Sequence, residues 1–160
     1  MKTFLLAFSL VLGALFSIHA EIPVQVSSET HNAETAALIA SFKQLINEHE
    51  DLRITHDTSE LRVVISLTAV SSGNDVVLGG MLEVRPPGGP LGVVARSSIV
   101  LATVGESRAM LRHLHHKLLI EDNLVNKLLF MRKHPVASGD LNEVCRLMMV
   151  AKAASDRGQI

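Results

Sequence analysis

The stretch ELRVVISLTAVSSGNDVVLGGMLEVR, residues 60–85, contains two apolar runs on either side of a turn. In the first run, aliphatic residues occupy every second position: Leu61, Val63, Ile65 and Leu67. A period of two is typical of a strand with one buried face. The residues SSGND at 71–75 are strong turn formers. We therefore predict a hairpin that anchors the fold.

Further strands are predicted on both sides of this hairpin. In the second run, Gly79 and Gly80 predict a bulge or a close backbone approach. The residues PPGGP at 86–90 must leave the sheet, because proline lacks the N–H that a ladder requires. Runs at 51–57 and 92–104 complete a set of about four strands, and the short polar connections favour an antiparallel meander. Residues 21–27 are predicted as a short extended lead-in.

Helical periodicity flanks the strands. Leu38, Phe42, Leu45 and Ile46 predict an amphipathic helix that ends near 48–51. Later helices are predicted from Thr103, capped with the help of Glu106, to about 120, and at 123–134 and 141–154. The predicted fold class is α+β: an antiparallel sheet of about four strands with helices packed on one face, in a single domain at 21–160. This layout is similar to small envelope domains such as the N-terminal module of TolB-type proteins. The resemblance is one of topology and implies no site residues.

The first twenty residues, MKTFLLAFSLVLGALFSIHA, predict a signal peptide. Lys2 precedes an apolar run at 4–16, and small Ala20 closes the segment. No later run is long enough for a stable membrane span after removal of the signal, and N-x-[ST] is absent. We expect a bacterial protein that is periplasmic or secreted.

The composition of the predicted mature chain argues against nucleic acid as a partner. Removal of 1–20 leaves Phe42 and Phe130 as the only Phe residues, in a chain without Trp or Tyr. Base stacking uses aromatic side chains. The 15 basic residues become 14 without Lys2, against 16 acidic ones, so the basic footprint of a DNA-binding protein is absent. The single Cys excludes an internal disulfide.

The segment LRHLHHKLLI at 111–120 holds the candidate metal ligands. On a helix, His113 and His116 lie one turn apart and opposite the apolar stripe, while His115 flanks it. Two imidazoles at this spacing are able to reach one Zn or Cu ion. The alternative is a solvated helix face, which we favour because no further ligand follows at a recognisable spacing.

Three other features resemble reactive sites. GESRA at 105–109 is half of a nucleophile elbow, but Ala109 replaces its last glycine, so Ser107 is interpreted as a helix-start residue. Cys145 is placed on the apolar stripe of its helix and is predicted to be a buried small hydrophobe. The acid–base groups at 49–51 and 56–57 are interpreted as surface turns. We predict no catalytic and no cofactor-binding residue.

Two functions are consistent with these observations. The first is a non-enzymatic interaction or accessory module with an envelope protein as partner, and the aliphatic strands and Leu147-Met148-Met149 predict an apolar patch for it. The alternative is a periplasmic metal-binding protein that uses His113 and His116. The sequence makes no prediction about the oligomeric state.

Overall fold

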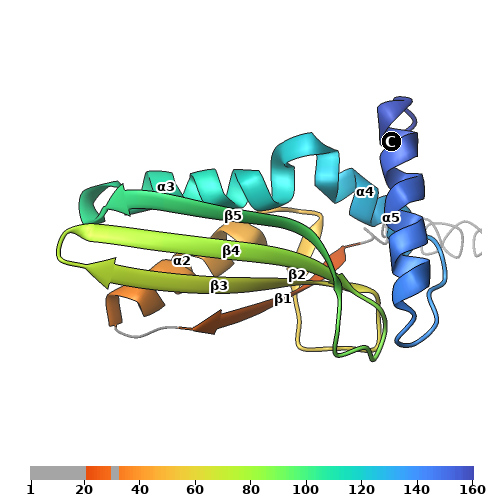
Figure 1. Cartoon of the computed structure of the whole chain (residues 1–160), viewed down its shortest axis with the longest axis horizontal. Coiled ribbons are helices and arrows are strands. Elements are labelled where there is room, and N and C mark those ends of the chain that lie inside the picture. Colours follow the sequence, from red (N-terminus) through yellow and green to blue (C-terminus); the bar gives the residue numbers. More distant parts are fainter. Residues whose placement is uncertain (1–20, 30–32) are drawn as a thin grey trace, which may run out of the picture.

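The structure is a computed structural model that describes residues 21–29 and 33–160, so the predicted signal peptide at 1–20 lies outside the described residues (Figure 1). The main elements follow in the order β1 (Ile22–Glu29), α2 (Ala33–Asn47), β2 (Leu52–Ile54), β3 (Arg62–Ser72), β4 (Asp75–Arg85), β5 (Val93–Thr103), α3 (Ser107–His115), α4 (Leu124–Arg132) and α5 (Leu141–Asp156).

The strands form one mixed sheet of five in the order β2-β1-β3-β4-β5. The α+β class is therefore confirmed, whereas the predicted antiparallel sheet of about four strands matches only roughly, because the sheet has five strands and is mixed. β1 is parallel to both of its neighbours, β2 and β3. The β3-β4-β5 meander is antiparallel, as the hairpin at 60–85 predicted.

The missed strand is β1, which the sequence analysis treated as a lead-in. Its first half pairs with β2 and its second half with β3, and only Val24 is in register with both. Pro23 therefore precedes the β3 pairing, so its missing N–H is tolerated. The 15-residue helix α2 supplies the crossover that parallel strands require. Pairing between distant segments of this kind leaves no local sequence signal.

Helices α2 and α3 cover one face of the sheet, here called the inner face; in Figure 1 they lie behind the strands. The alternating residues of the hairpin point into this layer as predicted, and Ile65, Leu78 and Leu82 are fully buried. Phe42 of α2 and Leu114 of α3 are buried against them in one hydrophobic cluster. Burial of this aliphatic layer is the main term that stabilises the fold.

Gly80 explains one of the predicted close approaches. A Cβ at this position would lie 2.5 Å from Leu118 Cδ1, so the glycine lets the helix layer approach β4. The bulge itself lies elsewhere, at the register shift between Leu82 and Glu83 opposite β5. Gly79, which points to the other face, would meet only ordinary contacts at 3.9 Å.

The predicted break after α3 is confirmed. The chain makes a π turn (His116–Ile120) and a 3-10 turn (Glu121–Asn123), in which Asp122 and Asn123 are left-handed with φ of 56° and 59°. α4 and α5 then pack at one end of the sheet (Figure 1). The Asp140 carboxylate accepts the Glu143 N–H at 3.0 Å and so caps the N-terminus of α5. Among the described residues, no helix combines the length and the hydropathy that crossing a bilayer requires.

Candidate functional site

The histidines at 113–116 lie in different environments. His113 of α3 and His116 of the π turn are exposed. Across residues 21–29 and 33–160, no group of three or more His, Cys, Asp or Glu side chains is placed to hold a metal ion. Binding of Zn or Cu by His113 and His116 thus stays a prediction, limited to two ligands from the described part of the chain.

His115 faces the interior instead. Its ring meets the Phe42 ring edge-on with centroids 6.1 Å apart, and its buried Nε2 has no hydrogen-bond partner among the described residues. Burial lowers the pKa of His115, and the nearby His49 and His116 lower it further. The imidazole is therefore neutral at pH 7 and packs as part of the interface between α2 and α3.

Within the described residues, neither Ser107 nor Cys145 is hydrogen-bonded to an acid–base group. Ser107 is the first residue of α3, whose N-terminus has no side-chain cap, so the structure supplies neither a triad nor the capping bond expected of it. Cys145 is exposed, and its predicted burial was wrong. The buried stripe of α5 runs through Val144, Leu147 and Ala151, so its phase differs by one position from the stripe assumed in the sequence analysis.

The acid–base groups near residues 50 and 57 form local turns. The Asp51 N–H donates to His49 Nδ1 at 3.3 Å. The Asp57 carboxylate accepts the Ser59 N–H at 2.8 Å, and this bond lowers the pKa of Asp57. These contacts satisfy turn backbone and supply no group that is aimed at a pocket, in agreement with the interpretation of both as surface turns.

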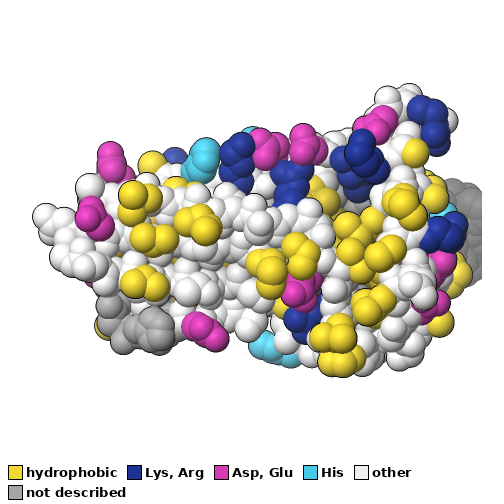
Figure 2. All heavy atoms as spheres, in the orientation of Figure 1, with side chains coloured by type: hydrophobic (Ala, Val, Ile, Leu, Met, Phe, Trp, Pro, Cys, Tyr) yellow, Lys and Arg dark blue, Asp and Glu magenta, His cyan; other side chains and the backbone are white. Residues whose placement is uncertain are grey.

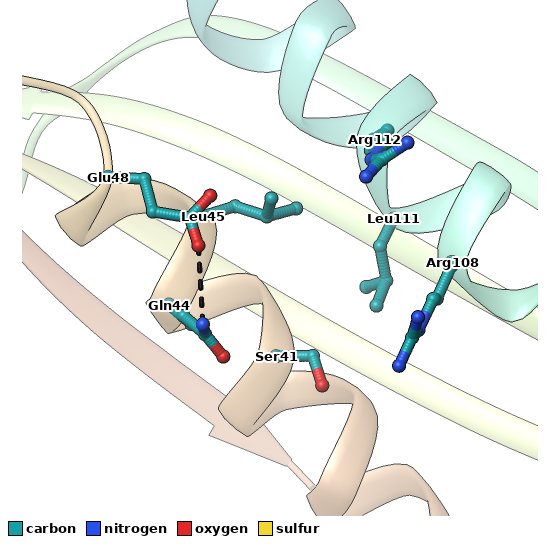
Figure 3. Close-up of a pocket in the computed structure, with 7 residues that line it drawn as sticks. All are labelled: Ser41, Gln44, Leu45, Glu48, Arg108, Leu111 and Arg112. Atoms are coloured by element: carbon teal, nitrogen blue, oxygen red, sulfur yellow. Dashed lines mark hydrogen bonds between the residues drawn. The ribbon is translucent and has the colours of Figure 1, made fainter.

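A groove of ≈ 300 Å³ runs between α2 and α3 (Figure 3). Arg108 and Leu111 extend from α3 toward α2, whose wall carries Ser41 and Gln44. Gln44 donates to Glu48 at 3.2 Å. Arg108 and its helical neighbour Arg112 are exposed, and neither has a recorded ion pair within the described ranges. The groove is cationic and open, but it contains no nucleophile beside a base.

The second candidate surface is the face of the sheet that α2 and α3 leave uncovered, here called the outer face. Four aliphatic side chains form what we call the outer patch: Val70 (48% exposed), Val77 (38%), Ile99 (77%) and Leu101 (69%). They border a shallow hollow of ≈ 660 Å³ that is floored by Gly79 and Gly80. Figure 2 shows hydrophobic side chains gathered over β3, β4 and β5 on this face. Clusters of exposed aliphatic residues are typical of binding surfaces.

The outer patch continues to an edge of the sheet. β5 is the last strand in the order, so one side of its 11-residue backbone has no partner strand within the described chain. Its one charged residue, Arg96, is bound to the Lys117 carbonyl at 2.8 Å and to Glu121 at 3.2 Å. Residues 97–103 therefore contain no charged residue and no proline, the residues that usually protect an edge strand from pairing with another chain.

This surface was not predicted from the sequence, because alternation within a strand does not show which parts of the sheet the helices leave uncovered. One signal was available: Val76-Val77 and Ile99-Val100-Leu101 place aliphatic residues on both faces of their strands. The predicted patch at 147–149 is only partly present, because Met149 is 67% exposed while Leu147 is buried.

No protein-family model matches the chain, and no curated protein matches its sequence. Solved structures that are similar include two of the PelC dodecamer from Paraburkholderia phytofirmans, with TM-scores of 0.42 and 0.41 and identities of 13% and 10%. These cover 61% and 62% of this chain and 85% and 88% of the PelC chains. A hypothetical protein from Chlamydia trachomatis has a TM-score of 0.40 and 7% identity. The match covers 59% of this chain and 94% of the Chlamydia chain. None of these likenesses identifies a family for this protein.

Proposed function

We propose that this chain is an exported, non-enzymatic interaction module of the bacterial envelope, which binds another polypeptide through the outer patch and the adjoining β5 edge. The observation that carries the proposal is the aliphatic patch on an uncovered sheet face, continuous with an unguarded edge strand. An edge strand gives affinity through backbone hydrogen bonds, and neighbouring apolar side chains give specificity.

The chemistry of the remaining surface supports binding over catalysis. His115 is held neutral inside the α2–α3 interface, and Ser107 makes no hydrogen bond to a base among the described residues. Arg108 and Arg112 provide charge in an open groove and no reacting group. Export, which rests on the predicted signal peptide at 1–20, makes the periplasm or the exterior the place where such a surface would act.

Site-specific photo-crosslinking in bacteria that express the full chain tests this function. A photoreactive residue at position 99 reports on the outer patch, and one at position 149 is the matched control because Met149 is similarly exposed on α5. We expect a discrete covalent adduct from position 99, recovered in the envelope fraction, and no matching adduct from position 149. Equal labelling of many proteins from both positions would show that the outer patch is no more than solvent-exposed surface.

Equilibrium dialysis tests the alternative function, binding of Zn or Cu by His113 and His116. The exported protein is compared with His113→Ala/His116→Ala, and uptake that disappears in the variant would favour the metal-binding function. We expect equal, weak uptake by both proteins, because tight sites use three or four ligands and the described residues assemble no such group.

A further inference from the structure

We propose that the partner strand comes from a second copy of this chain: the β5 edges of two copies pair antiparallel about a two-fold axis at Val100. The two five-stranded sheets then become one continuous sheet. This inference rests on the proposed function, since it names the partner of the same surface.

The two edges of the sheet differ in a way that favours this pairing. Edge strand β2 has only three residues, Leu52–Ile54, and its Arg53 pairs with Glu21 at 3.3 Å. Short length and outward charge are the usual protections of a sheet edge. β5 has 11 residues and neither protection over 97–103. Assembly through β5 alone consumes one edge per copy, so it closes at two copies and cannot propagate.

The register of the pairing is set by where the regular part of the β5 edge begins and ends. On one side, the register shift near Leu82/Glu83 and the Arg96 cluster interrupt it. On the other side, Thr103 is bound by Glu106, whose carboxylate accepts from the Thr103 hydroxyl at 3.1 Å. The symmetric centre of 97–103 is Val100.

This register matches apolar with apolar side chains. Opposed residues in an antiparallel pair point to the same face, so Ile99 lies opposite Leu101 of the second copy, and Leu101 lies opposite Ile99. The two outer patches become contiguous. The Arg96 clusters fall at opposite ends of the interface, so the pairing brings no like charges together.

Sedimentation equilibrium of the exported protein measures the association constant. We expect a reversible dimer in the wild type and at least tenfold weaker association in Ile99→Lys/Leu101→Lys, because each lysine then faces a lysine of the second copy. Met149→Lys is the control, since it adds one of the two lysine charges at a similarly exposed apolar position away from the edge, and it should associate as the wild type does. Circular dichroism confirms that each variant is folded.

The register is tested separately by disulfide trapping in a Cys145→Ser background. A mixture of Ile99→Cys and Leu101→Cys proteins should cross-link several-fold faster under mild oxidation than either protein alone, because directly opposed Cα atoms lie within disulfide range and diagonal ones do not. Equal rates in all three samples would overturn the register.

A wild-type protein that remains monomeric at about 100 µM, well above a typical micromolar dissociation constant, would overturn the second copy as partner. If position 99 still photo-crosslinks a different polypeptide in the envelope, the proposed function stands and only this inference fails. If position 99 gives no discrete adduct and the protein is monomeric, both fail.

Discussion

The two faces of the sheet carry the same kinds of side chain in opposite environments. Ile65 and Leu78 on the inner face are completely buried, whereas Ile99 and Leu101 on the outer face are mostly exposed. The difference arises from the helices, because α2 and α3 pack on one face only. Aliphatic residues stabilise the monomer on the first face, and on the second they are available to a partner.

The largest difference between the two faces is expected in the free energy of unfolding, when one side chain from each face is truncated to alanine. Phe42→Ala removes a fully buried ring from the inner layer and should lower the free energy of unfolding by about 3–5 kcal/mol. Ile99→Ala, on the outer face, should change it by less than about 0.5 kcal/mol. Urea denaturation of dilute protein measures both. A large loss in Ile99→Ala would mean that the outer patch is part of the monomer's own core.

The next prediction concerns Arg62, which is buried at one end of β3. Arg62 is 3% exposed, and its guanidinium donates to the carbonyls of Pro86 at 3.0 Å and Gly89 at 2.8 Å. Arg62→Met leaves the buried Gly89 carbonyl without its donor and removes one of two donors from the Pro86 carbonyl, which keeps the Gly89 N–H at 3.2 Å, and should cost about 3 kcal/mol. Arg85, its register partner on β4, makes a local ion pair with Glu83. Arg85→Met is therefore the control and should cost about 1 kcal/mol or less.

The adjacent residues Gly79 and Gly80 of β4 allow the packing of the two sheet faces to be compared at neighbouring positions. Gly80→Ala places a Cβ 2.5 Å from Leu118 Cδ1 and 3.4 Å from Leu67 Cδ2, so it should destabilise the fold by about 1–3 kcal/mol. Gly79→Ala meets nothing closer than 3.9 Å and should be neutral or slightly stabilising, because alanine loses less backbone entropy on folding. Thermal unfolding midpoints distinguish them. Equal losses would show that both faces are packed.

The smallest effect is expected from His115, where the inner face contains a titratable group. Burial holds its pKa in the folded chain below the ordinary value of about 6.5. As the pH falls from that ordinary value toward the folded pKa, the unfolded chain takes up a proton that the folded chain does not, so stability decreases. The slope cannot exceed about 1.4 kcal/mol per pH unit for one proton. Above pH 7 the contribution of His115 to stability is fully present and does not change with pH.

Denaturation at several pH values measures this dependence. His115→Gln should have a shallower slope below pH 6.5 than the wild type, and the exposed His113 provides the control variant His113→Gln, which should keep the wild-type slope. A wild-type slope in His115→Gln would assign the acid sensitivity to another group.

The inner face was largely predictable from the sequence, and the outer surface was not. Alternation identified Val63, Ile65 and Leu67 as inward residues, and helical periodicity placed an apolar stripe opposite His113 and His116, where Leu114 and Leu118 are buried. Both patterns are local. The insertion of β1 between β2 and β3 is a long-range pairing, which no local pattern indicates. The exposure of Cys145 was missed because the apolar stripe of α5 fits two phases, and packing against α4 selects one.

Amide hydrogen exchange in dilute protein tests the open β5 edge most directly. We predict that alternate amides of residues 97–103 exchange rapidly, because β4 engages only one side of the strand, while the amides at 63–68 of β3, which has a partner strand on both sides there, are protected. Protection of every amide in 97–103 equal to that of β3, at concentrations where the protein is monomeric, would contradict it, since the chain itself would then cover the edge.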